Sequence, residues 1–231
     1  MTKKVAILQS NYIPWKGFFD LICYVDEFII YDEMQFTRRD WRNRNNIKTP
    51  TGLQWLTVPV FSKGKTNQRI NETRIDGGKW QKDHWISLVK NYSRARFFEE
   101  ISKLLEPLYC HKNYNLLSEL NLTFINSICS FLSIKTRITS SSDYNLDGDK
   151  TKRLAKICEQ AGGTEYVSGL AAKEYIDEQV FKEMNISLTW FDYNGYMPYP
   201  QLWGQFIHEV SILDLLFNCG DDAAKFLKYT S

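Results

Sequence analysis

The chain has 231 residues, of which 43% are hydrophobic and 24% are charged, and its formal net charge is +2. This length and apolar content predict a globular protein with a substantial core and exclude disordered and fibrous chains. The nearly balanced charge argues against duplex DNA as a partner, because duplex binding usually requires a more basic surface.

The cysteines are five in number, widely spaced and without a CxxC pair: Cys23, Cys110, Cys129, Cys158 and Cys219. Scattered thiols in an odd number predict a reduced, cytoplasmic protein with neither a disulfide framework nor a zinc knuckle. The N-terminal stretch MTKKVAILQ becomes polar at Gln9, so we expect neither a signal peptide nor a membrane span. The spacing of the acidic residues recommends no metal site.

The chain opens with a βαβ pattern. Apolar residues 5–8 predict a first strand, residues 17–24 a helix, and residues 28–31 a second strand. Such a unit requires a parallel pair of strands, so Gln9 and Asp32 should lie together near the carboxyl ends of neighbouring strands. In open α/β sheets, ligands bind at that edge.

The rest of the chain continues the alternation of strands and helices. We expect strands at 55–60, 71–75, 135–140, 166–168 and 186–193, and helices at 150–161, 171–184 and 210–217. A helical segment at about 79–132, broken at Pro107, separates the two halves. The predicted fold is therefore α/β, a Rossmann-like, mostly parallel sheet with flanking helices and a helical insertion, in a single domain spanning residues 1–231.

A basic aromatic segment follows the second strand. It places five cations beside an indole, Trp41, with Asp40 as the one acidic residue among them: Arg38, Arg39, Arg42, Arg44 and Lys48. Guanidinium groups fork onto phosphate or carboxylate oxygens, and an indole covers a ring face. The pattern predicts a loop that binds a flat, anionic small molecule, and a solvated charged turn is the alternative.

Other parts of the chain add candidate residues. His84 lies on the predicted helix at 80–92 and titrates near neutrality, which suits a general base, although a structural histidine is the plainer interpretation. Ser168 and Gly169 precede a helix and can offer backbone N–H groups to an anion, with Lys173 one turn further on, unless they form an ordinary turn. Residues 196–201 form an aromatic loop typical of a sugar pocket or of a rigid crossing.

Several stretches together resemble the WbqC-like family: QSNYIPWKGFFDLI, YDEMQFTRRDWRNRNNIKTPTGLQWLTVPV, KWQKDHWISLVKNYSRARFF, YVSGLAAKEYI and SILDLLFNCG. The resemblance runs from residue 5 to about residue 220. It implies work on amino sugars or nucleotide-linked sugars for bacterial surface polysaccharide, the O-antigen of lipopolysaccharide, by an acyl- or aminoacyl-transferase. A function at this level rests on association with the family.

Such a transfer requires an anchor for the anionic substrate, a base, and donors for an oxyanion. We expect His84 or Asp32 as the base. The expected substrate-binding residues are Gln9, Tyr12, Gln35, Arg38, Trp41, Arg42, Asn43, Arg44, Asn45, Lys48, Ser168, Gly169 and Lys173. No cofactor is expected beyond an activated donor, for which an aminoacyl-tRNA, an acyl thioester and an aminoacyl adenylate are all open. The competing hypotheses are a non-catalytic module that binds a nucleotide sugar or glycan, and a nucleotidyltransferase-like enzyme.

Overall fold

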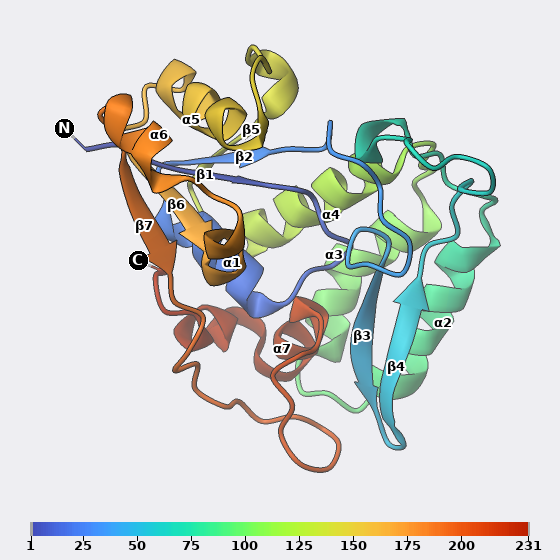
Figure 1. Cartoon of the computed structure of the whole chain (residues 1–231). Coiled ribbons are helices and arrows are strands. Elements are labelled where there is room, and N and C mark those ends of the chain that lie inside the picture. Colours follow the sequence, from blue (N-terminus) through green and yellow to red (C-terminus); the bar gives the residue numbers. More distant parts are fainter. Residues whose placement is uncertain (1, 231) are drawn as a thin grey trace.

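The computed structural model describes residues 2–230 and shows a five-stranded sheet flanked by helices (Figure 1). The strands follow the order β5-β2-β1-β6-β7, and every neighbouring pair is parallel. Their bounds are β1 Lys4–Leu8, β2 Glu27–Ile30, β5 Arg137–Ser140, β6 Glu165–Gly169 and β7 Ser187–Phe191. The predicted α/β fold with a mostly parallel sheet is confirmed.

Alternate residues of the central strand β1 face two separate apolar cores. Ala6 packs in the larger core with α1 (Lys16–Tyr24) and α7 (Ile212–Cys219). Val5 and Ile7 pack in the smaller core, which α5 (Lys150–Gln160) and α6 (Glu178–Glu183) cover on the other face. This follows from the two-residue period of a strand, which turns successive side chains to opposite faces. β1 is therefore buried on both sides.

The order of the strands reverses beside β1. The first half of the sheet extends from β1 to β2 and β5, whereas the second half extends from β1 to β6 and β7. The carboxyl ends of β1 and β6 therefore lie at a topological switch point, where the connections leave toward opposite faces and open a crevice.

The helical insertion consists of α2 (Lys79–Tyr92), α3 (Phe98–Cys110) and α4 (Leu117–Phe131), which precede β5 in the chain and pack on the larger core. The break expected at Pro107 is wrong, because α3 continues through it. Proline removes the N–H bond to the carbonyl four residues earlier, and α3 tolerates this loss three residues before its end.

Residues 44–57 form a hairpin apart from the main sheet. β3 (Arg44–Thr49) and β4 (Gly52–Thr57) pair in antiparallel register, with Gly52 at a φ of 116° in the turn. The strand expected at 55–60 therefore lies at 52–57, and the second half of the basic segment, expected as part of a loop, is itself a strand. The expected strand at 71–75 is replaced by a short 3₁₀ turn, η1 (Ile70–Glu72).

The helix expected at 171–184 is divided into η3 (Leu170–Glu174) and α6, because the Asp177 side chain accepts from the N–H of Gln179 and caps a new helix. The remaining short turns are η2 (Ser141–Asp143) and η4 (Gly220–Phe226). Across residues 2–230, no helix combines the length and apolarity needed to cross a membrane. Nor do the described residues contain a group of three or more His, Cys, Asp or Glu side chains placed to hold a metal.

Candidate functional site

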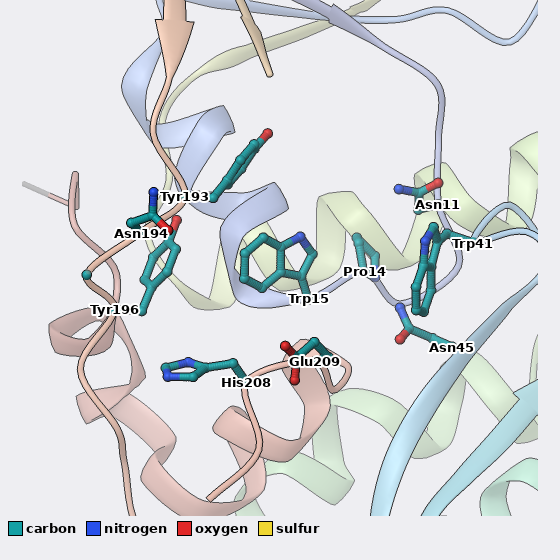
Figure 2. A pocket seen from close by; sticks show the side chains of 11 residues that line it. Asn11, Pro14, Trp15, Trp41, Asn45, Tyr193, Asn194, Tyr196, His208 and Glu209 are labelled. Atoms are coloured by element: carbon teal, nitrogen blue, oxygen red, sulfur yellow. The ribbon is translucent and has the colours of Figure 1, made fainter. Parts of the chain in front are cut away.

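A cavity of about 490 Å³ opens at the carboxyl edge of the sheet, between the loop after β1 and the loop after β7 (Figure 2). We call it the aromatic cavity. The segment before α7 and the start of the hairpin complete it. Its lining residues are Asn11, Pro14, Trp15, Trp41, Asn45, Tyr193, Asn194, Gly195, Tyr196, His208 and Glu209.

Aromatic rings form the walls of this cavity. The ring centroid of Trp15 lies 5.5 Å from that of Tyr193 and 5.6 Å from that of Tyr196. Trp41 stands at the opposite end, 44% exposed, with its ring centroid 5.4 Å from that of Trp55. Ring faces of this kind suit a ligand that has apolar ring faces and polar edges, such as a sugar or a base.

The position of Trp15 depends on Gly17. A Cβ atom at residue 17 would lie 2.3 Å from Cζ2 of Trp15, so only glycine leaves room for the indole at the start of α1. Ile13, in the same loop, has a φ of 38°, which is strained for a β-branched residue. Its carbonyl accepts hydrogen bonds from Asn45 Nδ2 (3.0 Å) and Ser211 Oγ (2.7 Å), and these bonds hold the loop in place.

Asn11 presents an amide donor to the cavity. The guanidinium of Arg42 donates from Nη1 to Asn11 Oδ1, which fixes the amide so that Nδ2 points toward the cavity (Figure 2). Asn45 is held differently, because its Nδ2 donates to the carbonyls of Tyr12 and Ile13 while its Oδ1 accepts from the backbone N–H of residue 46. Arg42 therefore orients a cavity residue and does not itself line the cavity.

His208 and Glu209 supply titratable groups at the floor of the cavity (Figure 2). Neither side chain hydrogen-bonds to another residue within the range 2–230. Burial, reinforced by the charge on Lys16, lowers the pKa of His208 from its ordinary value. The imidazole is therefore neutral at neutral pH and can accept a proton.

Lys16 lies directly behind this floor. Its Nζ donates to the carbonyl of Met197 (3.0 Å) and stands 5.0 Å from the ring centroid of Tyr196. Burial lowers the pKa of Lys16 to about 8. Its ammonium remains largely charged at neutral pH and disfavours a second positive charge on His208.

Asp32 was expected as a base, and the structure places it in a structural hydrogen-bond network. Its carboxylate accepts from the Ser10 N–H (2.8 Å), the Ser10 hydroxyl (2.7 Å) and the Ser118 hydroxyl (2.6 Å). The side chain is buried and does not line the aromatic cavity. Asp32 joins the loop after β1 to the end of β2, as expected from the parallel pairing, but its oxygens are already engaged.

His84, the other expected base, lies in an aromatic cluster inside the helical insertion. Its Nδ1 is 2.9 Å from the hydroxyl of Tyr12, which is also 2.7 Å from the hydroxyl of Tyr109. The side chain is 6% exposed, and burial lowers its pKa to about 4. Tyr12 is fully buried and belongs to the same cluster. This geometry supports structural roles for both residues.

The cations of the basic segment do not converge on the aromatic cavity. Arg38 is exposed and donates to the carbonyl of Ser62, whereas Arg44 covers the ring of Trp55 at 4.1 Å. Lys48 is buried and donates to Gln201 Oε1 (2.7 Å). The basic segment thus contributes Trp41 and Asn45 to the cavity, whereas none of its cations is among the lining residues.

The remaining predicted residues are dispersed. Asn43 is buried and donates to the carbonyl of Val58 (2.8 Å), and Gln35 is exposed and donates to the carbonyl of Thr66 (2.5 Å). Lys173 is exposed, with its Nζ 5.3 Å from the ring centroid of Trp190. A second cavity, at the carboxyl ends of β1 and β6, is lined by the other three: Gln9, Ser168 and Gly169.

Sequence reasoning missed most of the aromatic cavity. His208 and Glu209 were not among the expected site residues, and the aromatic loop at 196–201 was interpreted as typical of a sugar pocket or of a rigid crossing. Trp15 carried a usable signal, because Pro14 and Gly17 flank an indole at the end of a parallel strand. No pattern in the sequence near either segment predicts that this loop and residues 208–209 line the same cavity.

Comparisons with known proteins agree with the resemblance seen in the sequence. The chain is 59% identical over 227 residues to the uncharacterized protein Rv1507c of Mycobacterium tuberculosis, and the match covers 98% of each chain. No solved structure matches it. The WbqC-like protein family matches residues 9–226, from the loop after β1 to the end of η4. This chain therefore belongs to the WbqC-like protein family.

Proposed function

We propose that this protein transfers an acyl or aminoacyl group from an activated donor to the amine of an amino sugar or nucleotide-linked sugar. The observation that carries the proposal is the pair His208 and Glu209, unbonded to other described residues, beside the aromatic walls of a cavity at the carboxyl edge of the sheet. The resemblance to the WbqC-like family supplies the context, the synthesis of bacterial surface polysaccharide such as O-antigen.

The aromatic cavity accounts for recognition of the sugar. Trp15 and Tyr196 offer ring faces for the apolar face of a pyranose, and Trp41 can cover a second ring at the far end. Glu209 and Asn45 Oδ1 accept hydrogen bonds from hydroxyl groups. Because these side chains lie on separate loops, their spacing selects the shape of the ligand.

The transfer itself requires one base and one oxyanion donor. The sugar amine attacks the carbonyl carbon of the donor, a C–N bond forms, and the neutral imidazole of His208 accepts the proton from the amine. Asn11 Nδ2 donates to the carbonyl oxygen as negative charge develops on it. The C–O or C–S bond of the donor then breaks, and the imidazolium returns the proton to the leaving group. The products are an amide and the protonated leaving group.

The test begins with ligands of the native protein. A thermal-shift screen with amino sugars, nucleotide-linked sugars, acyl thioesters and nucleotides identifies binders, because a ligand bound only by the folded state raises the apparent stability. Binders are then combined with acyl and aminoacyl donors, and mass spectrometry detects the amide. Quenching of Trp15 and Trp41 fluorescence reports binding in the aromatic cavity.

The variant His208→Gln separates chemistry from binding. Removal of a general base should lower turnover by about 100-fold or more while the affinity for the sugar changes little. His111→Gln is the matched control, because His111 is exposed at the end of α3. Unchanged turnover in His208→Gln would remove His208 from the mechanism.

A non-catalytic module that holds a nucleotide sugar or glycan is the second candidate, favoured by aromatic walls that serve binding without any base. It predicts ligand binding, no amide with any donor, and equal ligand affinity in His208→Gln and the wild type. Release of pyrophosphate in the same assay would instead indicate nucleotidyl transfer.

A further inference from the structure

A second cavity, of about 320 Å³, lies at the topological switch point between β1 and β6. We call it the switch-point cavity. We propose that it binds a nucleoside phosphate, at a site separate from the aromatic cavity. The transferase proposal does not assign it a ligand, and the inference stands without that proposal.

The topology creates this cavity. Gln9 follows the end of β1, and Ser168 and Gly169 form the end of β6, so residues from both sides of the switch point line it. Connections that leave toward opposite faces keep the crevice open, and in open α/β sheets this is where nucleotides bind. The position therefore favours a ligand that lies across two strand ends.

Charge at the cavity favours phosphate. Lys150, the first residue of α5, lines the cavity, and no acidic side chain is among the lining residues within the range 2–230. Arg153, one turn further on, donates from Nη1 to the hydroxyl of Tyr31 (3.2 Å), and its buried Nε has no hydrogen-bond partner among the described residues. Lysine and arginine with nearby aromatic hydroxyls are typical partners of phosphate oxygens.

The walls favour a flat ring beside the phosphate. Tyr31, Tyr166 and Tyr175 contribute aromatic surface, and Tyr175 is 47% exposed with the Lys150 ammonium 3.5 Å from its ring centroid. Gln9 makes no side-chain hydrogen bond to another residue in the described part of the chain, so its amide can pair with both a donor and an acceptor on a base edge. A ring-bearing phosphate uses all of these groups, and inorganic phosphate uses only the cations.

The two cavities lie close to each other near Gly169. A Cβ atom on Gly169 would lie 3.3 Å from Cε2 of Tyr193, and Tyr193 lines the aromatic cavity from its other side. The loop after β1 likewise contributes Gln9 to one cavity and Asn11 to the other. A nucleotide in the switch-point cavity therefore lies next to the aromatic cavity without filling it.

Isothermal titration calorimetry of the full chain with ADP, UDP, adenosine, uridine and inorganic phosphate tests the proposal. We expect ADP or UDP to bind more tightly than the matching nucleoside and more tightly than inorganic phosphate. Lys150→Gln should weaken that binding about tenfold, the effect of losing one charge-assisted hydrogen bond. Lys152→Gln, on the same helix and outside the cavity, should leave it unchanged.

Two results would overturn the inference. One is the absence of binding by either nucleotide at millimolar concentration. The other is nucleotide binding that is lost in Trp41→Ala and kept in Lys150→Gln, because it would place the nucleotide in the aromatic cavity. Lys150 is exposed, so its replacement should not prevent folding. Hydrogen exchange in the wild-type protein provides a second measurement of binding. Bound nucleotide should protect the amides of residues 8–10 and 168–175.

Discussion

The carboxylate of Asp32 accepts hydrogen bonds from both the backbone N–H and the hydroxyl of Ser10, at 2.8 and 2.7 Å. This pair ties the loop after β1 to the end of β2, and a third bond from Ser118 ties both to α4. The loop that shapes both cavities is therefore anchored by a buried carboxylate whose bonding capacity is largely used.

Asp32→Asn should destabilise the protein by about 2–4 kcal/mol, because the new NH₂ group replaces one of two buried oxygens that both accept hydrogen bonds and therefore faces a donor there. Urea denaturation measures the loss. Asp83→Asn is the control, since Asp83 forms only an exposed pair with Lys79 at 3.9 Å, and its change should stay within about 0.5 kcal/mol. Equal stability of the two variants would contradict the anchoring role.

His84 should make the protein sensitive to acid. Its pKa is about 4 in the folded state and near 6.5 in the unfolded chain, so the unfolded chain binds the proton first as the pH falls. The free energy of unfolding keeps the full contribution of the neutral His84 side chain above pH 6.5. It decreases between about pH 6.5 and 4, by about 3 kcal/mol in total. Denaturation of wild type and His84→Gln across this range measures it, and the variant should show the shallower dependence. If the stability of both proteins fell in parallel with pH, His84 would be excluded as the source of the acid sensitivity.

Gly17→Ala should displace Trp15 from the wall of the aromatic cavity, because the added Cβ would lie 2.3 Å from the indole. We expect a changed near-UV circular dichroism spectrum, weaker sugar binding and a stability loss of about 1–3 kcal/mol. Gly78→Ala is the matched control, since its nearest neighbour would lie 4.0 Å away. A native spectrum in Gly17→Ala would show that Trp15 does not depend on this glycine.

Arg42→Gln should release the Asn11 amide, because Nη1 of Arg42 is the group that fixes Oδ1. With Nδ2 no longer held toward the cavity, turnover in the amide-forming assay should fall by about tenfold or more while the sugar affinity stays nearly constant. Arg38→Gln serves as the comparison, since Arg38 is exposed and reaches only the carbonyl of Ser62. Similar rates in the two variants would show that Arg42 does not position the donor.

The pH dependence of turnover should identify His208. Burial lowers its pKa below the ordinary value of about 6.5, so the neutral base persists into mild acid. The fall in activity on the acid side should therefore be centred below pH 6.5, at the lowered pKa. In His208→Gln, the residual rate should lose this acid limb. An acid limb in wild type centred above pH 6.5 would point to a different base.

A similar buried carboxylate, Asp214, joins parts of the C-terminal segment. Asp214 accepts from the hydroxyls of Tyr92 (2.8 Å) and Tyr199 (2.9 Å) and from Gln201 Nε2 (2.9 Å). These bonds hold the segment that carries His208 against α2.

The strands of the main sheet and most of the helices were readable from the sequence alone, because the periodicity of a strand or helix is a property of neighbouring residues. The opening βαβ unit, the helical insertion and the apolar face of each element follow from it. The basic segment was also visible, and residues 38–43 do form a loop, but that interpretation was wrong for Arg44–Thr49, which pairs with Gly52–Thr57 and turns Lys48 inward.

Only the tertiary structure decided which polar residues meet. Asn11 and His208 share a cavity because the loops after β1 and β7 end at the same edge of the sheet, an arrangement set by strand order and by packing on two cores. The same packing buried His84 and Asp32, which looked reactive in isolation. Chain neighbours determine local structure, whereas long-range packing determines which side chains remain unbonded and face a cavity.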